Sequence, residues 1–148
     1  MNLYEVEIRY PNHLHPQDAA SYPDLDALDV ESKFDAIQWR RQLTLQLQLE
    51  SHDTTFRVED HATDHVFILT LKGYASETDL RFKLESNIEV MTSHKNLFGL
   101  LTVKTKEKIN FPLLSLAEAR ECLSQFLSQN FEPMRERYRE KDKRPAKA

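Results

Sequence analysis

The sequence contains only two glycines, Gly73 and Gly99, in 148 residues. Average usage of about 7% would give roughly ten in a chain of this length. Phosphate-binding loops need several glycines in register, because only a residue without a Cβ lets the backbone approach the anion closely. The patterns GxGxxG, GxxxxGK[S/T] and GxSxG occur nowhere in the sequence. The familiar nucleotide-binding loops and the serine-hydrolase elbow are therefore excluded.

Cysteine and long apolar runs are also scarce. Cys122 is the only cysteine, which excludes a disulfide framework or a site of several thiolates and fits a reducing compartment. The best apolar runs, near residues 66–69 and 97–101, are far shorter than the roughly 20 residues of a membrane span. Residues 1–7 are acidic and alternating, unlike a secretory signal. We therefore expect a cytoplasmic protein with no membrane partner.

Charge is unevenly distributed along the chain. Residues 1–64 carry 13 acidic and 5 basic side chains, whereas residues 135–148 carry 7 basic and 3 acidic ones. We expect a single domain over residues 1–134 and a charged, frayed basic tail over residues 135–148. No nucleic-acid partner is expected, because the acidic part of the chain would repel a phosphate backbone and Tyr138 is the only aromatic residue in the tail.

Alternation of apolar and polar residues dominates the first two thirds of the chain and predicts strands. The predicted strands cover residues 4–10, 37–49, 56–58, 65–72, 80–90 and 97–105. Short polar connections at 51–54, 61–64, 75–79 and 92–96 favour antiparallel hairpins. The stretch 11–35 is too long for a hairpin, and we expect an irregular connection with short helical turns around Val30 and Phe34.

The periodicity becomes helical after Ser115. Ser115 and Glu118 have the spacing of a capping box, and an apolar helical stripe follows at Leu116, Ala119, Leu123, Phe126 and Leu127. Pro133 disfavours helix at the preceding residue, so the helix should end near residues 129–131 and a second, charged helix can begin at Pro133. The predicted fold is α+β, an antiparallel meander sheet of about six strands with a C-terminal helix packed on one face.

His61 and His65, with Asp60 and Asp64 beside them, are the best candidates for metal ligands. The spacing His-x-x-x-His aligns two ligands on a helix, but this segment is predicted to be a turn followed by a strand. We therefore predict no metal site and no cofactor. Cys122 follows a carboxylate well inside the predicted helix, where no cation activates the thiol, so we expect a core residue and no catalytic site.

Two polar groups are candidates for binding a protein partner. Acidic side chains in the long connection are expected to be presented on an irregular loop: Asp24, Asp26, Asp29, Glu31 and Asp35. The polar face of the predicted strand 37–49 supplies amides that can donate and accept across a wet interface, with Gln42 and Gln46 as candidates. Complementary charge on a basic partner would speed encounter.

The order of these features resembles that of small bacterial immunity proteins, which neutralise a cognate toxin domain in the cytoplasm. The resemblance covers residues 36–130 and rests on a tryptophan-bearing segment before 55–60, the strands 65–69 and 80–90, and the helix that begins Ser115-Leu116-Ala117-Glu118. It implies a non-catalytic inhibitor whose acidic segment faces a basic toxin domain.

Two alternatives stay open. The first is a small-ligand-binding or enzymatic module with an apolar pocket between a curved sheet and a helix. A deep cavity with converging polar groups would favour that alternative. The second is a SecB-like export chaperone, which the chain resembles in setting a multi-stranded sheet before a C-terminal helix.

Overall fold

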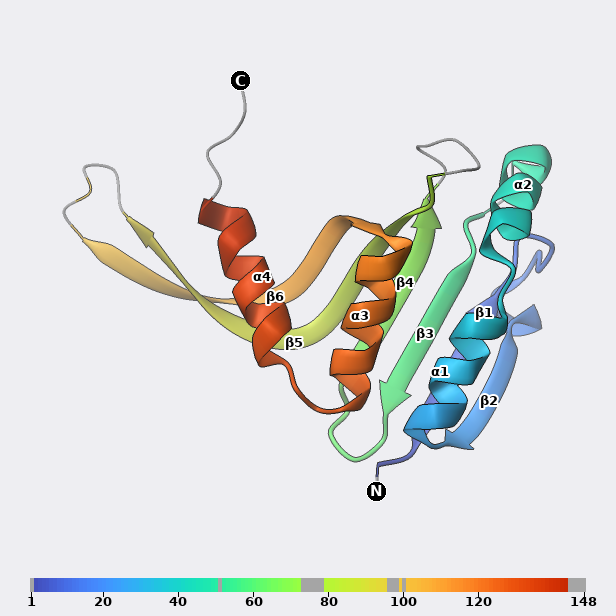
Figure 1. The fold of residues 1–148 in the computed structure, drawn as a ribbon, viewed down its shortest axis with the longest axis horizontal. Helices are drawn as coiled ribbons and strands as arrows, with labels where there is room; N and C mark the ends of the chain where they lie inside the picture. Colours follow the sequence, from blue (N-terminus) through green and yellow to red (C-terminus); the bar gives the residue numbers. More distant parts are fainter. Residues whose placement is uncertain (1, 51, 73–78, 96–98, 100, 144–148) are drawn as a thin grey trace.

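A computed structural model describes residues 2–50, 52–72, 79–95, 99 and 101–143. Six strands form one antiparallel sheet in the order β2-β1-β3-β4-β5-β6 (Figure 1). The strands are β1 (Tyr4–Arg9), β2 (Ala20–Leu25), β3 (Thr55–Asp60), β4 (Val66–Lys72), β5 (Arg81–Lys95) and β6 (Thr102–Ser115). The helices are η1 (Pro16–Asp18), α1 (Ala27–Ala36), α2 (Trp39–Leu49), α3 (Leu116–Leu127) and α4 (Glu132–Lys143). The predicted α+β fold is confirmed.

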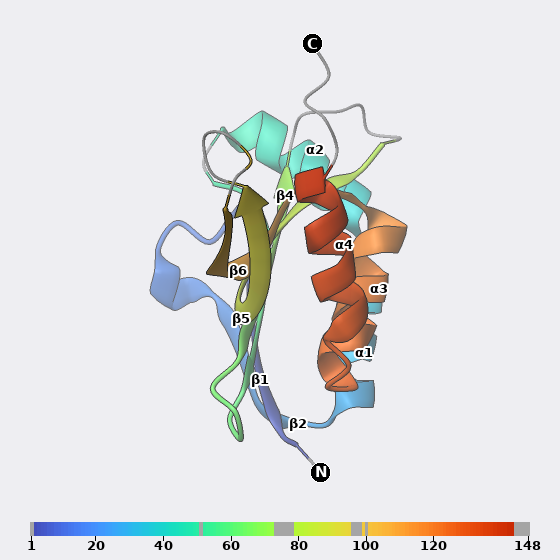
Figure 2. The same ribbon diagram turned by 90° about the vertical axis from the view of Figure 1, so that its left-hand side faces the viewer.

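Helices α1, α3 and α4 lie on one side of the sheet (Figure 2). Figure 2 shows α1, α3 and α4 side by side against one face, with α2 at the upper end of the sheet. The strands alternate accordingly, because successive side chains of a strand point to opposite faces: Phe67, Leu69 and Leu71 of β4 are fully buried beneath the helices, and the residues between them are half-buried. Among the described helices, none has the length and apolar character that a membrane crossing requires.

The segment predicted as a long strand over residues 37–49 is a helix, so that prediction is wrong. In α2 the buried side chains are Trp39, Leu43 and Gln46, which follow the i, i+4, i+7 spacing of one helical face. Leu47 and Leu49, which the alternating pattern placed on an apolar strand face, are about half exposed. Leucine, glutamine and arginine are good helix formers, and this propensity prevails over the period-2 pattern.

The predicted irregular connection over residues 11–35 contains regular structure. It holds η1, the outer strand β2 and most of α1. The helical turns expected around Val30 and Phe34 are confirmed, since both side chains are buried on the inner face of α1. The loop expected to display acidic side chains is therefore largely a strand and a helix.

Strands β5 and β6 extend beyond the rest of the sheet as a two-stranded arm (Figure 1). Residues 89–95 pair with residues 102–108, from Glu89 opposite Lys108 to Lys95 opposite Thr102. The connection predicted at 92–96 is wrong for 92–95, which continue β5. The sixth strand was predicted over 97–105, whereas β6 runs from Thr102 to Ser115, and residues 96–98 and 100 lie outside the described residues.

The predicted start of α3 is confirmed. The Glu118 N–H donates to Ser115 Oγ at 3.1 Å, and the Ser115 N–H donates to Glu118 Oε1 at 3.0 Å. α4 begins at Glu132 and takes in residues 135–143 of the predicted tail, while residues 144–148 lie outside the described residues. Two arginines of α4 reach the arm: Arg135 Nε donates to the Glu89 carbonyl at 3.0 Å and Arg139 Nε to the Met91 carbonyl at 3.1 Å.

Candidate functional site

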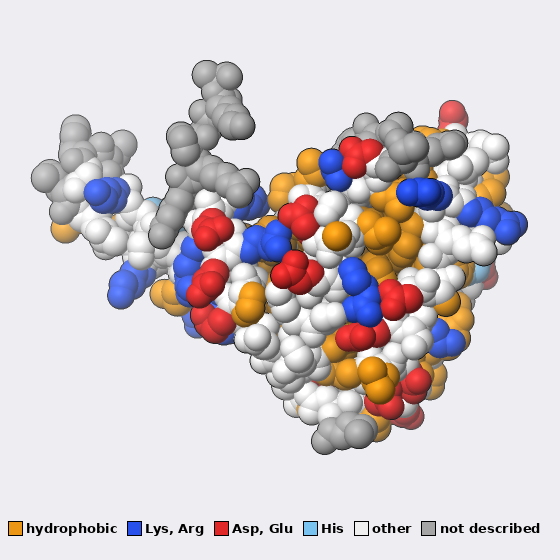
Figure 3. All heavy atoms as spheres, viewed as in Figure 1, with side chains coloured by type: hydrophobic (Ala, Val, Ile, Leu, Met, Phe, Trp, Pro, Cys, Tyr) orange, Lys and Arg blue, Asp and Glu red, His pale blue; other side chains and the backbone are white. Residues whose placement is uncertain are grey.

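A cleft of about 740 Å³ lies where the end of α1, the start of α2 and the first turns of α3 meet. We call it the α1–α3 cleft. Its apolar lining consists of Phe34, Ile37, Trp39, Leu80 and Leu116, and its charged lining of Asp35, Arg40, Arg41 and Arg120. Figure 3 shows apolar side chains gathered between the helices on this face, with charged groups around them.

The floor of the cleft is a cluster of aromatic rings. The Trp39 ring centroid lies 5.2 Å from that of Phe34 and 5.0 Å from that of Phe82, which it meets edge-on at 88°. Trp39 is only 5% exposed, so its ring is held by its neighbours and the floor is formed before any ligand arrives. The indole N–H of Trp39 is buried and has no hydrogen-bond partner among the described residues.

One wall of the cleft is a fixed network around Arg120. Its guanidinium donates from Nε to Asp35 Oδ1 at 2.8 Å and from Nη2 to Asp35 Oδ2 at 3.1 Å, a bidentate pair. It also donates to Glu31 Oε2 at 3.1 Å and to Ser124 Oγ at 2.6 Å. The hydrogen bonds to Asp35 are the main cause of the raised pKa of Arg120. The wall therefore joins α1 to α3 and offers no unpaired cation.

The opposite rim carries two arginines, Arg40 and Arg41, whose surroundings differ from those of Arg120. Arg40 and Arg41 lie in the first turn of α2 and are exposed. Within the described ranges, neither side chain makes a hydrogen bond or an ion pair. The first turn of α2 has no acidic residue, and its N-cap residue Gln38 makes no side-chain cap bond. Because the N-terminal end of a helix is itself partly positive, cationic character is concentrated at this rim.

The five predicted acidic residues do not form one exposed group. Asp26 caps α1 by accepting the Asp29 N–H at 2.8 Å, and Asp24 lies in β2 with a left-handed backbone, at φ 56°. Glu31 and Asp35 are held by Arg120. Asp24 and Asp29 are exposed, and of the five only Asp35 lines the α1–α3 cleft.

The two predicted glutamines do not form a polar strand face, because they lie on a helix. Gln46 is 7% exposed, and its amide connects α2 to the sheet by donating to the Leu71 carbonyl at 3.0 Å and accepting the Thr54 N–H at 2.7 Å. Gln42 is half-buried, and its buried Oε1 has no hydrogen-bond partner among the described residues. Gln46 is therefore occupied inside the protein.

The histidines considered as metal ligands point to different neighbours. His61 Nε2 lies 3.6 Å from Glu5 Oε2, whereas the His65 ring packs against Phe131 with centroids 5.1 Å apart. The buried Asp60 accepts hydrogen bonds from Asn2 and from Gln129, both at 2.9 Å. Within the described parts of the chain, no three histidine, cysteine or acidic side chains are grouped so that they could hold a metal ion.

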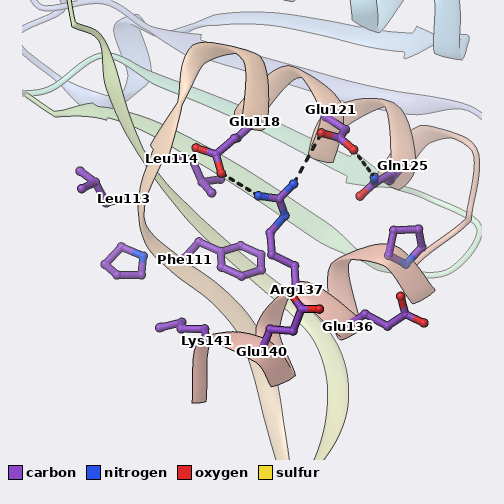
Figure 4. A pocket seen from close by; sticks show the side chains of 12 residues that line it. Phe111, Leu113, Leu114, Glu118, Glu121, Gln125, Glu136, Arg137, Glu140 and Lys141 are labelled. Atoms are coloured by element: carbon purple, nitrogen blue, oxygen red, sulfur yellow. Dashed lines mark hydrogen bonds and ion pairs between the residues drawn. The ribbon is translucent and has the colours of Figure 1, made fainter. Parts of the chain in front are cut away.

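A second cleft, of about 480 Å³, lies between α3, α4 and β6 and is shown in Figure 4. Arg137 of α4 reaches across it to Glu118 at 2.7 Å and to Glu121 at 3.5 Å. The Ser115 N–H is the main cause of the lowered pKa of Glu118, and Arg137 adds to it. Arg137 is thus paired with two carboxylates across this cleft, whereas Arg40 and Arg41 of the α1–α3 cleft have no acidic partner among the described residues.

Cys122 is a core residue, as expected, and is fully buried in α3. Burial raises the pKa of its thiol to about 11. The thiol is therefore protonated at neutral pH, where a nucleophile or a metal ligand would have to be a thiolate.

The sequence interpretation missed the α1–α3 cleft. One signal was present: the pair Arg40-Arg41 interrupts the apolar–polar alternation of residues 37–49. Residues 34–39 of the lining directly precede this pair, but Leu80 and residues 116–120 are distant in the sequence, and their proximity to the pair depends on how α1, α2 and α3 pack. The chain matches no protein-family model, and comparisons with curated proteins and with solved structures found no similar protein.

Proposed function

We propose that this protein is a non-catalytic protein-binding module that anchors its partner in the α1–α3 cleft. The observation that carries the proposal is the composition of that cleft, in which a rigid tryptophan floor is bordered by arginines. Tryptophan and arginine are enriched among the residues that supply most of the binding energy at protein interfaces. Leu116, 38% exposed at the cleft, adds an apolar side chain that a partner would cover.

A protein partner fits this cleft better than a small molecule does. Sites for small molecules combine an apolar lining with a few polar groups that converge on the ligand. In the α1–α3 cleft, Asp35 and Arg120 bind each other, and Arg40 and Arg41 lie exposed at the rim. Such a distribution, apolar at the centre and charged around it, is typical of the contact surface of a protein.

For the partner we propose a toxin domain that is neutralised by binding, the role implied by the resemblance to immunity proteins. Two features of the structure support this class. Asp24 and Asp29 are exposed, which offers negative charge to a basic toxin surface, and the preformed floor of the cleft needs little reorganisation on binding. Preorganisation of this kind reduces the entropic cost of association.

The binding proposal is tested with the full chain as bait in extracts of the source cell. Leu116→Glu places a charge in the α1–α3 cleft and should abolish capture of the partner. Leu113→Glu is the matched control, because Leu113 is 53% exposed and lines the second cleft. Equal capture by the two variants would refute the assignment to the α1–α3 cleft.

The toxin role has its own test. The captured partner is expressed alone and together with this chain, and growth is measured. Expression of the partner alone should arrest growth, wild-type chain should restore it, and Leu116→Glu should not. A partner that is harmless when expressed alone would exclude the immunity role while leaving the binding role intact.

A further inference from the structure

The chemistry of the α1–α3 cleft also defines the segment that it receives. The apolar lining favours a large apolar side chain in this cleft of about 740 Å³, because the 38% exposed Leu116 lies beside a floor formed by Phe34, Ile37 and Trp39. These three residues are 2%, 8% and 5% exposed. The floor is therefore closely packed, and a ligand would lie on it without displacing it.

The place where the cleft can bind an anion depends on which of its arginines are already paired with acidic side chains. Arg120 is saturated by Asp35, Glu31 and Ser124, so it attracts no further anion. Arg40 and Arg41 have no acidic partner among the described residues, and they lie at the positive end of α2. An incoming anion would therefore be bound at this rim and not at the opposite wall.

We propose that the α1–α3 cleft binds a protein segment in which a large apolar side chain is adjacent to a carboxylate. The apolar side chain lies on the Trp39 floor, and the carboxylate faces Arg40 and Arg41. This inference rests on the proposed function, and it adds a charge requirement to it. It assigns the contact at the cleft to an acidic segment of the partner, separate from any basic surface that faces Asp24 and Asp29.

The experiment uses the single tryptophan of the chain as a reporter. The indole N–H of Trp39 gives one resolved signal in a proton–nitrogen spectrum of the full-length, nitrogen-15-labelled protein. Three peptides are titrated: acetyl-Gly-Leu-Glu-Gly-amide and its two counterparts with Gln or Lys in place of Glu. The Glu peptide should shift the indole signal with a dissociation constant about two- to fivefold lower than the Gln peptide, the range expected for exposed ion pairs. The Lys peptide should bind most weakly.

Matched variants separate the charge requirement from the apolar one. Arg40→Gln/Arg41→Gln should remove the preference for Glu over Gln while the peptides still shift the indole signal. Lys104→Gln/Lys108→Gln, on the exposed face of the arm, should leave the preference unchanged. Higher salt should reduce the preference in the wild-type protein, because exposed charges are screened.

The outcomes distinguish this inference from the proposed function. Equal affinity for the three peptides, or no shift of the indole signal by any of them, would overturn the charge requirement. If a partner were nevertheless captured and lost with Leu116→Glu, the proposed function would stand alone. If the peptides showed the expected order but no partner depended on Leu116, the cleft specificity would stand and the proposed function would fall.

Discussion

The side chain of Gln46 in α2 accepts a hydrogen bond from the main-chain N–H of Thr54 at 2.7 Å. The same amide donates to the Leu71 carbonyl at 3.0 Å. Thr54 immediately precedes β3 and Leu71 lies near the end of β4, so one glutamine satisfies main-chain groups at the adjacent ends of two neighbouring strands. This contact holds α2 against the sheet and thereby positions Trp39 at its other end.

Gln46→Ala should therefore destabilise the protein substantially. The variant leaves a buried N–H and a buried carbonyl without their partner, and each such group costs about 1–3 kcal/mol. Chemical unfolding measures the difference in the free energy of unfolding. Gln48→Ala, at an exposed position of the same helix, is the control and should stay within about 0.5 kcal/mol of wild type. Similar values for the two variants would contradict the role of Gln46.

Leu123→Ala should reduce the free energy of unfolding by about 2–5 kcal/mol, because Leu123 is fully buried in α3 and its removal leaves a cavity. Leu28→Ala is the control, since Leu28 is 74% exposed on α1. Thermal unfolding of the two variants measures the contrast. A cost below about 0.5 kcal/mol for Leu123→Ala would mean that α3 does not cover the sheet.

The carboxyl group of Glu118 should make the free energy of unfolding depend on pH. The Ser115 N–H, with Arg137, lowers the pKa of the Glu118 carboxyl below its ordinary value of 4.5 in the folded protein. The contribution of this carboxylate to the free energy of unfolding is therefore fully present above pH 4.5. It is lost as the pH falls through the lower pKa that the group has in the folded protein. The stability difference between wild type and Glu118→Gln should shrink over that interval of falling pH. A difference that stays constant with pH would show that the carboxylate is not stabilised by folding.

The Cys122 thiol should resist modification in the folded protein. Its pKa is raised to about 11 by burial, so at pH 8 both the absence of solvent access and the scarcity of thiolate oppose reaction. A disulfide reagent should modify the native protein slowly and the denatured protein rapidly. Rapid labelling under native conditions would show that α3 opens readily from the sheet.

Asp26→Ala should cost about 1 kcal/mol, because Asp26 caps α1 through the Asp29 N–H. Asp29→Asn should have little effect on stability, since the Asp29 side chain is exposed. Had these side chains stood on an irregular loop, as the sequence interpretation expected, neutralising Asp26, Asp29 and Glu31 together would leave stability almost unchanged. With Asp26 as a cap and Glu31 bound to Arg120, we expect a stability loss from that triple variant, measured by thermal unfolding.

The parts of the fold that could be predicted are those in which local chemistry and burial agree. The capping box of Ser115 and Glu118 marks the start of α3 whatever the helix packs against. In strands β1, β3 and β4, buried and half-buried residues alternate, because one face of the sheet is covered by helices and the other is not. In these elements most of the buried residues are apolar, with Asp60 of β3 as an exception.

Helix α2 could not be recognised in this way, because one of its three buried residues is polar. Gln46 is drawn inward by Thr54 and Leu71, whereas Leu47 and Leu49 stay half exposed. The periodicity of the apolar residues therefore indicated a strand where the structure has a helix. The candidate site was lost with it, since Trp39, Arg40 and Arg41 meet Arg120 only when residues 39–49 are helical and α3 is docked.

The two arginines of α4 that reach the arm have a consequence for association between copies of the chain. Beyond Ser86, β5 has no pairing with β4, so one edge of this strand presents main-chain groups that would template the addition of a foreign strand. Arg135 and Arg139 occupy the Glu89 and Met91 carbonyls on that edge and place positive charge beside it. α4 thus protects the base of the arm, at Glu89 and Met91, against edge-to-edge aggregation.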